Sequence, residues 1–399
     1  MRTTAVPDGA EAPDPAPGYS LWQLIRYFLK LGTIGFGGPV ALVEYMHRDL
    51  VEQRHWIAEG DYRDGLALSQ LAPGPLAAQL AIYLGFVHYR VTGATAAGIA
   101  FVLPSFLMVV ALGWAYVRYG GLSWVQAVFY AVGAAVIGII AYSAFKLTRK
   151  SIGRSLLLWT IYAIAATVTI VTESEEVWLF LAAGVVVWLA KAPPDVRRLR
   201  GGAAGFLLTP AGFGAPGVSG LDLDLLGRIL AFFTYAGAFV FGSGLAIVPF
   251  LYGGVVKEHG WLTDQQFLDA VAVALITPGP VVITTGFIGF LVAGLPGATV
   301  AAAATFLPAY VLTIIPAPYF KKYGKQRGVA AFVEGVTAAA IGAIGGAVVV
   351  LGRRSVVDLP TGLIAVATVV LLWRAKVPEP VIIVVAAILG LLLYPGSRT

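Results

Sequence analysis

Long apolar runs dominate the chain and predict helices that cross a membrane. The runs lie near residues 93–117, 123–146, 155–172 and 176–190, and again near 297–319, 327–351, 359–373 and 380–394. A helix needs about 20 apolar residues to cross a bilayer, and the longer runs reach that length. The strands of an outer-membrane barrel alternate instead of running continuously apolar. The pattern therefore predicts an all-α polytopic membrane protein.

Four further apolar segments are interrupted by glycine and proline. In the first half, "FLKLGTIGFGGPVALVEYM" is broken at "GFGGP", and "DGLALSQLAPGPLAAQLAIYLG" at "APGP". In the second half, "FTYAGAFVFGSGLAIVPF" is broken at "FGSG", and "DAVAVALITPGPVVITTGFIGF" at "TPGP". Because proline removes a backbone donor and clashes with the preceding turn, we expect two half-helices at each break. Proline is favoured at the first helical position, so Pro39, Pro75 and Pro280 are each predicted to begin a half-helix.

The two halves of the chain repeat one another. The "PGP" at 73–75 falls on the "PGP" at 278–280 at an offset of 205 residues, without a gap from residue 28 to 80. "FVLPSF" at 101–106 then matches "TFLPAY" at 305–310, at an offset of 204. The sequence predicts transmembrane repeats at 20–190 and 225–395, each with two broken or re-entrant helices followed by about four transmembrane helices. Residues 1–19 are predicted to be a disordered tail, and 191–224 a basic Pro/Gly-rich linker.

The basic loops exchange places between the repeats. "KLTRKSIGR" (146–154) and "KAPPDVRRLR" (191–200) are basic in the first repeat, and "KKYGKQR" (321–327) and "WRAKVPEP" (373–380) in the second. Cytoplasmic loops carry the excess of Lys and Arg, so the repeats are predicted to have inverted topology. We expect a multi-pass protein of the inner (plasma) membrane whose central linker is cytoplasmic. Arg353 and Arg354 then fall outside, as the exception to the pattern.

Composition narrows the chemistry. The chain is 58% hydrophobic and 12% charged, and it contains no cysteine. Its four histidines lack zinc-ligand spacing, so neither a metal nor another cofactor is expected. No Walker motif and no nucleophile–base constellation is present, so no catalytic residue is assigned and an enzyme is not expected. The net charge of +6 is explained by loop orientation, so nucleic acid is not an expected partner.

The paired helix breaks predict a binding site for an anion at the repeat interface. Half-helix N-termini carry free N–H groups and positive dipole ends. A single break is explained equally well as a packing kink, but matching breaks in two repeats favour a site. The predicted substrate-binding residues are Lys30, Gly37, Gly38, Pro39, Gln70, Pro73, Gly74, Pro75, Gln79, Gly242, Ser243, Gly244, Thr277, Pro278, Gly279, Pro280 and Thr284.

The polar side chains beside the prolines have two interpretations. Gln70, Gln79, Thr277 and Thr284 could donate hydrogen bonds to an oxyanion, or they could join neighbouring helices. Lys30 lies inside an apolar run and is favoured as a buried cation, although its long side chain could instead extend to the membrane interface. Both alternatives remain open at this point.

Three charged residues are candidates for coupling or ion pairing. Glu44 follows the first break by about one helical turn, and an i, i+4 pair with Arg48 is favoured over a titrating carboxylate. Arg48 and Arg63 are expected at the interface, paired with acidic neighbours.

The motifs resemble the chromate ion transporter family. The resemblance rests on "GFGGPVALVEYMHRDLVEQRHWI", "LSQLAPGPLAAQLAIYLGF" and "LPSFL" in the first half, and on "FGSGLAIVPFLYGGVV", "LITPGPVVITTGFIG" and "FLPAY" in the second. It implies a two-domain transporter of chromate, with sulfate as an analogue, that acts outward as a resistance system. The family's motifs fall on Gly37, Gly38, Pro39, Pro73, Gly74, Pro75, Gln79, Pro278, Gly279 and Pro280.

The sequence therefore predicts a secondary transporter of an inorganic oxyanion, with the lipid bilayer as its other partner and a homodimer as a possible assembly. A passive anion channel is the first alternative. A carrier of sulfate or another oxyanion, for which chromate is incidental, is the second. A membrane enzyme or lipid scramblase is a third and weaker alternative.

Overall fold

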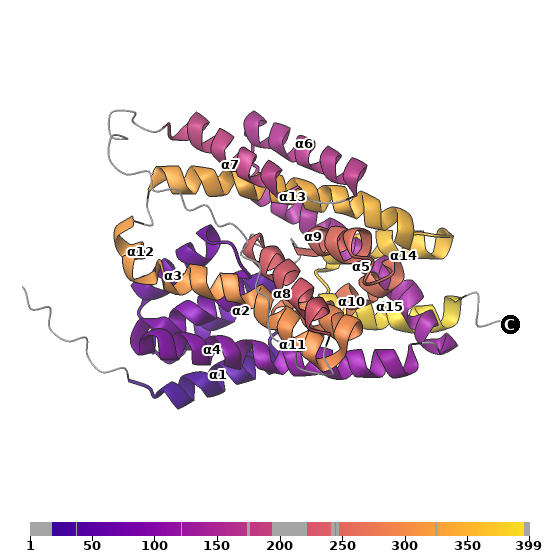
Figure 1. Ribbon diagram of the computed structural model, residues 1–399, viewed down its shortest axis with the longest axis horizontal. Coiled ribbons are helices and arrows are strands. Elements are labelled where there is room, and N and C mark those ends of the chain that lie inside the picture. Colours follow the sequence, from indigo (N-terminus) through magenta and orange to yellow (C-terminus); the bar gives the residue numbers. More distant parts are fainter. Residues whose placement is uncertain are drawn as a thin grey trace, which may run out of the picture.

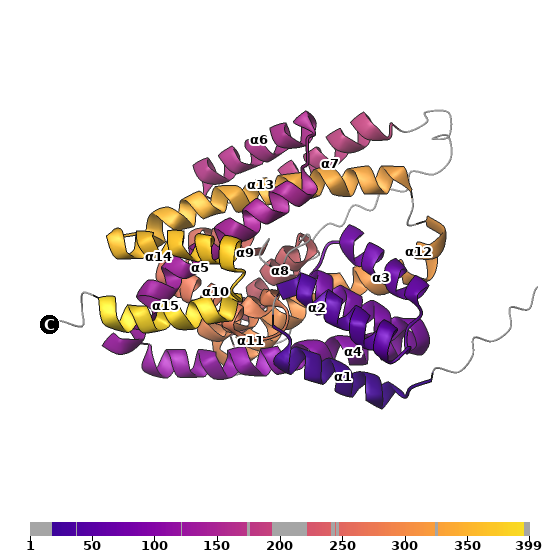
Figure 2. The same ribbon diagram turned by 180° about the vertical axis from the view of Figure 1, so that it is seen from behind.

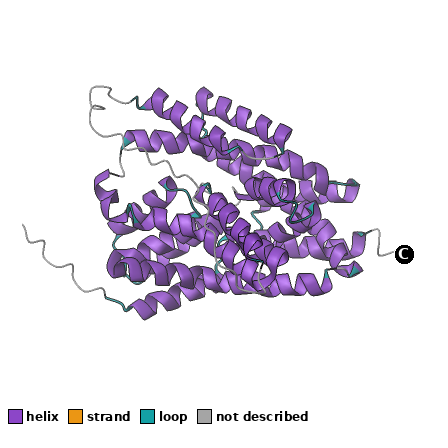
Figure 3. Cartoon of the chain, viewed as in Figure 1, coloured by secondary structure: helices purple, strands orange, loops and turns teal. Residues whose placement is uncertain are grey.

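The chain folds into a bundle of helices. The computed structural model describes residues 18–36, 38–120, 122–173, 176–193, 222–240, 244, 247–323 and 326–394. Figure 3 shows that its regular structure is helical throughout these residues, which confirms the predicted all-α class. Residues 1–17 of the predicted tail and 194–221 of the predicted linker lie outside the described residues. Tyr19, predicted as the end of the disordered tail, is instead buried and stacks on Trp56 with ring centroids 4.8 Å apart, because its aromatic ring adds to the core of the first repeat.

The helices of the first repeat follow the predicted order. They are α1 (Leu21–Ile34), α2 (Gly38–Met46), the π-helix η1 (His47–Gln53), α3 (Glu59–Leu71), α4 (Leu76–Tyr119), α5 (Ser123–Ser151), α6 (Leu156–Thr172) and α7 (Val177–Lys191). The breaks at "GFGGP" and "APGP" separate α1 from α2 and α3 from α4, as predicted.

Within the described residues, the second repeat follows the same order of elements, with three short elements added. They are α8 (Leu223–Ala238), α9 (Ile247–Tyr252), the π-helix η4 (Gly253–Glu258), α10 (Asp264–Ile276), the 3-10 turn η5 (Val281–Ile283), α11 (Thr284–Ile314), α12 (Ala317–Tyr323), α13 (Arg327–Ser355), α14 (Leu359–Val370), the π-helix η6 (Leu371–Ala375) and α15 (Glu379–Leu393). By the repeat offset, α1 corresponds to α8, α3 to α10, α4 to α11, and α5, α6 and α7 to α13, α14 and α15.

Local sequence sets several helix starts. The Ser20 hydroxyl accepts the Gln23 N–H, and the Gln23 side chain accepts the Ser20 N–H in return. Thr263 and Gln266 form the same capping box at α10, and the Asp358 carboxylate caps α14. Each cap satisfies backbone donors that have no partner within the helix.

Helices α4 and α11 are each folded back on themselves. The backbone of α4 leaves helical geometry at Arg90 (φ 51°), and a Cβ on Gly85 would lie 2.3 Å from the Gly93 carbonyl oxygen. Such a contact eight positions along the chain requires a helical hairpin. In α11 the turn comes at Gly294 (φ 62°), with the matching close approach of Gly289 and Gly297. The Pro-Gly-Pro half-helix is the first arm of each hairpin.

Equivalent arms of the two hairpins run in opposite directions. Thr95, near the start of the second arm of α4, shares a hydrogen bond of 2.6 Å with Tyr310, near the end of α11. Gly113, near the other end of α4, lies against Phe290, close to the α11 turn. The second arm of α11 therefore runs from Gly113 back toward Thr95.

The last helices of each repeat pack on the other repeat. Helices α6 and α7 lie along α13, and α14 and α15 lie along α5, as Figures 1 and 2 show from opposite sides. Glycines allow this close packing, since a Cβ on Gly342 would lie 2.4 Å from the Tyr162 carbonyl oxygen and one on Gly138 would lie 2.7 Å from that of Ala365. Two of the buried apolar clusters therefore combine residues of both repeats, whereas a third is built almost wholly from the first repeat.

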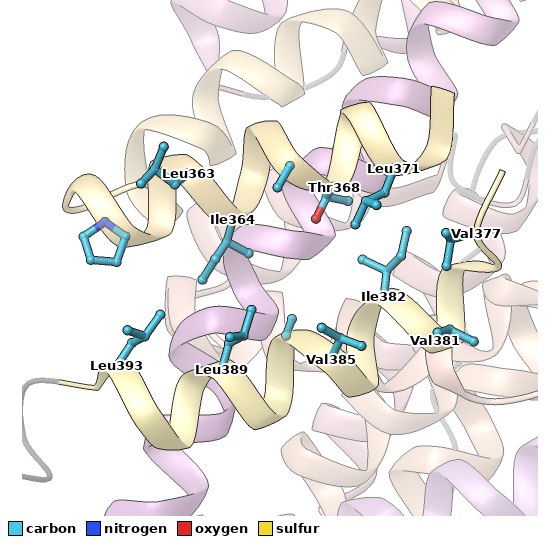
Figure 4. Close-up of a pocket in the computed structure, with 13 residues that line it drawn as sticks. Leu363, Ile364, Thr368, Leu371, Val377, Val381, Ile382, Val385, Leu389 and Leu393 are labelled. Atoms are coloured by element: carbon cyan, nitrogen blue, oxygen red, sulfur yellow. The ribbon is translucent and has the colours of Figure 1, made fainter. Parts of the chain in front are cut away.

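Several helices have the length and composition of membrane spans. Among the described residues these are Leu76–Tyr119, Ser123–Ser151, Val281–Phe320 and Arg327–Ser355, and shorter apolar helices occupy the remaining predicted runs. The groove between α14 and α15, about 400 Å³, has Thr368 as its single polar lining residue (Figure 4). Its lining is unsuited to holding an anion.

Candidate functional site

The two Pro-Gly-Pro segments each dock against the broken helix of the other repeat. The Gly74 N–H donates to the Val240 carbonyl oxygen, 2.5 Å away, and the Gly279 N–H donates to the Gly35 carbonyl oxygen, 3.0 Å away. These bonds are equivalent, because Gly74 corresponds to Gly279 and Gly35 to Val240 at the repeat offset. Each Pro-Gly-Pro break is therefore held at the repeat interface against the end of the helix that precedes the other repeat's first break.

Only glycine suits the two central positions. Gly74 has a φ of 146° and Gly279 a φ of 97°, a region that side chains with a Cβ rarely adopt. Space is also missing, since a Cβ on Gly74 would lie 2.6 Å from the Gln79 side chain and one on Gly279 would lie 2.1 Å from the Ser105 Oγ. In this conformation the junctions are closely packed.

Two buried polar atoms at the junctions have no partner among the described residues. The Gln79 side chain is fully buried, and its Nε2 donates to the Pro73 carbonyl oxygen at 2.9 Å while its Oε1 is left unpaired. The Ser105 Oγ is also buried and unpaired, beside Gly279. An unpaired buried polar group costs about 1–3 kcal/mol, so a ligand that pairs with either atom would remove that cost. An anion can pair with the Ser105 hydroxyl, which donates, but not with the Gln79 Oε1, which only accepts.

The prolines lie at the starts of the half-helices, each one position away from the first helical position that was predicted. Pro75 and Pro280 are N-cap residues, because α4 begins at Leu76 and η5 at Val281. Pro39 is the second residue of α2. Pro75, Pro278 and Pro280 are buried, Pro73 is partly buried and Gly244 is buried. Gly37, Gly242 and Ser243 lie outside the described residues.

The two threonines are already hydrogen-bonded within their own helices. The Thr277 hydroxyl donates to the Val273 carbonyl oxygen at 2.7 Å, and the Thr284 hydroxyl donates to that of Val281 at 2.8 Å. Both side chains are buried beside the second junction. In this conformation their hydroxyl hydrogens are therefore not free for an anion, although their oxygens can still accept.

Two predicted polar residues lie on the surface. Lys30 and Gln70 are exposed, so the expectation of Lys30 as a buried cation is wrong in this structure. The position of a residue around the helix axis decides which way its side chain points. Lys30 lies on the exposed face of α1, whereas Leu31 and Gly32 lie on its buried face.

Arg48 and Arg63 each form an ion pair with an acidic residue close by in the sequence. Arg48 pairs with Asp49 at 2.9 Å rather than with Glu44, so the favoured Glu44–Arg48 pair is wrong. The reason is local: η1 begins at His47, and its wider turn ends the i, i+4 register that would align the two side chains. Arg63 pairs with Glu59 at 2.7 Å, an acidic neighbour as expected.

A cluster of charged side chains joins the two repeats by ion pairs. Glu173, at the turn after α6, accepts from Lys257 and, at 2.7 Å, from Arg354, which also pairs with Asp264. The hydrogen bond from Lys257, with Arg354 beside it, holds the pKa of Glu173 below its ordinary value. Arg354, the exception in the loop pattern, is thus neutralised by an acidic turn of the other repeat.

Ser105 is the residue at the junction that sequence reasoning did not single out as a site residue. It lies in "FVLPSF", at the position that Ala309 occupies in the repeated "TFLPAY". The available signal was this serine-for-alanine difference between the copies. Among the described residues no cluster of three or more His, Cys, Asp or Glu residues could hold a metal ion.

Comparison with known proteins covers almost the whole chain. A family model described as chromate transporter matches residues 22–188 and 227–391. The chain is 65% identical to the chromate transport protein of Cupriavidus metallidurans over 398 residues, 99% of each chain. It is 64% identical to the probable chromate transport protein of Synechococcus elongatus over 383 residues, 95% of this chain and 97% of the relative.

A more distant relative is the chromate transport protein of Pseudomonas aeruginosa. It is 29% identical over 407 residues, which cover 96% of this chain and 94% of the relative. No solved structure matches the chain.

Proposed function

Because the chain belongs to the chromate transporter family, we propose that it is a secondary transporter that carries chromate out of the cell. Its relatives are named as transport proteins, so the prediction of a transporter rather than an enzyme is confirmed, as is the family resemblance. The apolar helices make it a multi-pass membrane protein. The proposal adds the inner membrane as its location, a cytoplasmic linker, chromate resistance as the outcome, and sulfate as an analogue.

The repeats are proposed to have inverted topology. Support comes from the second arms of α4 and α11, which run in opposite directions although they are equivalent in sequence. If both cross the membrane, the axis relating the repeats lies in the membrane plane. The ion pair between Glu173 and Arg354 is consistent with this, since it places the acidic turn of one repeat on the same face as the α13 end of the other.

The anion is proposed to bind at the repeat interface, beside the two junctions. The observation that carries this proposal is the reciprocal docking of Gly74 on Val240 and of Gly279 on Gly35. It holds the N-terminus of each Pro-Gly-Pro half-helix at the repeat interface, where free N–H groups and positive dipole ends favour a dianion. The unpaired Ser105 hydroxyl is an additional donor at the second junction, beside Gly279.

The present conformation corresponds to a closed state of such a carrier. Both glycine amides are occupied by carbonyl oxygens of the other repeat, and the surrounding atoms leave no room for a Cβ. Movement of one repeat relative to the other would release these amides toward a bound anion. A carrier of this kind alternates between two open states, and in each state the anion site faces a different side of the membrane.

Transport is tested with purified protein in liposomes. We expect the vesicles to take up radiolabelled chromate faster than protein-free vesicles under an imposed gradient. Gly74→Leu should abolish this flux, because the position has a positive φ and no free space. Gly133→Ala is the matched control, since Gly133 is a buried helical glycine with nothing within 4 Å of the added Cβ. Equal flux in Gly74→Leu and Gly133→Ala would contradict the proposed site.

Two further measurements separate the alternatives. Unitary currents in single-channel recordings would identify a channel instead of a carrier. Expression in a chromate-sensitive host should raise tolerance if transport is outward, whereas increased sensitivity would indicate uptake. Competition by unlabelled sulfate tests whether the site accepts a second tetrahedral dianion.

A further inference from the structure

Asp269 is a buried carboxylate that bridges the two repeats. It lies on α10, and 3% of its surface is exposed. One carboxylate oxygen accepts the Tyr116 hydroxyl at 2.6 Å, from α4 of the first repeat, and the other accepts the Gln265 amide at 2.8 Å. No ion pair of Asp269 occurs within the described part of the chain. A buried carboxylate without a cation is costly while it is charged, and inside a membrane protein such a group indicates function.

The equivalent position in the first repeat lacks this environment. Asp64 corresponds to Asp269 at the repeat offset, but it is only partly buried. The residue equivalent to Tyr116 is Phe320, and the residue equivalent to Gln265 is Gly60. Neither can donate a side-chain hydrogen bond. The hydrogen-bonded carboxylate is therefore specific to one repeat and is not required by the shared fold.

A polar cavity connects Asp269 with the surface. It has a volume of about 380 Å³, and its lining includes Tyr116, Tyr130, Gln126, Gln265 and Tyr394 as well as Asp269. Gln126 and Gln265 are exposed, so the cavity opens to the surface between polar side chains. A carboxylate that meets water through a polar cavity can exchange a proton with it.

The other titratable groups around this cavity are tyrosines or are bonded elsewhere. Tyr116 comes from α4, Tyr130 from α5 and Tyr394 follows α15. The Tyr130 hydroxyl donates to Asp358. Phe287 of α11 packs on Tyr116, with ring centroids 5.7 Å apart, and Val282 of η5 belongs to the same buried apolar cluster as the α10 residues. Asp269 is therefore the carboxyl group that this cavity makes accessible.

Asp269 is also well placed to affect the anion site. It lies two turns before the end of α10 at Ile276, and the second Pro-Gly-Pro follows directly. Its bond to Tyr116 holds α10 against the opposite repeat, and any rearrangement of the two repeats must stretch or reorient that bond. Protonation changes the carboxylate from an acceptor of two hydrogen bonds to a group that also donates.

We propose that Asp269 binds the coupling proton, so that the carrier exchanges an entering proton for a departing chromate. The inference rests on the proposed function and names the coupling ion for it. The proton enters from the water of the cavity, binds a carboxylate oxygen while the repeats rearrange, and is released on the other side, so Asp269 returns to its starting state. Each cycle moves one proton inward and one dianion outward, which is a net inward movement of three positive charges. Tyr116 and Gln265 position the carboxylate.

The test measures chromate accumulation in liposomes with an acidic lumen and a clamped membrane potential. If one proton is exchanged per anion, the ratio of chromate concentration in the lumen to that outside changes about tenfold for each unit of pH difference. Asp269→Asn should keep exchange of chromate for chromate but lose this dependence. Chromate itself takes up protons in acid, but this contributes equally to every variant, so the comparison is between variants.

Asp64→Asn is the matched control, because it makes the same change at the equivalent position. It should respond to the gradient as the unmodified protein does. Tyr116→Phe removes one donor from the charged carboxylate and should move the pH midpoint of the flux upward. Asp269→Glu should restore the gradient response. An equal response in Asp269→Asn and the unmodified protein overturns the inference.

A substrate-free measurement separates this inference from the proposed function. Infrared difference spectra of the purified protein across a pH series should show a protonated-carboxyl band that Asp269→Asn lacks and Asp64→Asn keeps. If that band is absent from the unmodified protein, the proton site is wrong even where chromate flux is present. If the band is present but no chromate flux occurs, the proposed function and the coupling role are wrong, while the titrating carboxyl stands.

Discussion

The two Pro-Gly-Pro junctions share one backbone and differ in their side chains. At the first, Gly74 lies against Gln79 and Ala309; at the second, Gly279 lies against Ser105. Each glycine donates to the carbonyl oxygen of an equivalent residue in the other repeat. The shared part of the site is thus backbone geometry, which glycine and proline preserve in both copies.

The differing part is the chemistry available to a ligand. Thr284 replaces Gln79 at the equivalent position, and Ala309 replaces Ser105. Consequently the amide oxygen is offered at one junction and the free hydroxyl at the other. The two repeats have the same backbone arrangement at their junctions, but a few side chains differ, so the two junctions are chemically unequal. The same holds for Asp269, whose hydrogen-bonded environment is absent at Asp64.

Gly279→Ala is expected to have the largest effect. Placing a Cβ at a positive φ costs about 1–2 kcal/mol, and overlap with the Ser105 Oγ, 2.1 Å away, adds about 1–3 kcal/mol. Thermal unfolding should therefore shift downward, and chromate flux should be lost. Adding Ser105→Ala should restore part of the stability by removing the overlap. A double variant no more stable than Gly279→Ala would contradict the overlap.

Gly342→Ala tests the exchanged helices. Its Cβ would lie 2.4 Å from the Tyr162 carbonyl oxygen, so α6 must move away from α13 at a cost of about 1–3 kcal/mol. Denaturant unfolding in detergent would measure this loss. Gly133→Ala, which has free space, should be neutral or slightly stabilising. Equal stability of the two variants would argue against close packing between the repeats.

Ser105→Ala should separate transport from stability. The hydroxyl has no partner to lose, so unfolding should change by no more than about 0.5 kcal/mol. Loss of a hydrogen bond to a charged ligand costs about 1.5–3 kcal/mol, which lowers flux about tenfold or more. Ala309→Ser, the reciprocal change, provides a control for the added hydroxyl. Flux unchanged in Ser105→Ala would remove this serine from the anion site.

Glu173→Gln is expected to have the smallest effect. The folded-state pKa of Glu173 is below its ordinary value, so its contribution to stability is present above the unfolded pKa and declines as pH falls through the folded one. The unmodified protein should lose this increment on acidification, and Glu173→Gln should not. The group is partly exposed, so the increment is small. Parallel stability curves against pH would contradict the role of the pair.

Much of the fold could be predicted from the sequence because it depends on local pattern. Apolar runs, breaks at glycine and proline, and the repeat offset predicted the helices and their interruptions, since backbone hydrogen bonding and helix period are local properties. The Glu44–Arg48 pair failed because the helix widens at His47. The prediction of Lys30 as a buried cation was wrong because the position of a residue around the α1 axis, rather than the hydropathy of the segment, determines whether its side chain is exposed.

Only the tertiary structure decided which atoms meet. The docking of Gly74 on Val240, the unpaired Ser105 hydroxyl and the bond from Tyr116 to Asp269 all join residues that lie far apart along the chain. The sequence by itself determined that two similar units would each carry two interrupted helices. How those units exchange helices and face each other depends on packing across their interface, where close approach at glycines selects one arrangement from the many that local pattern allows.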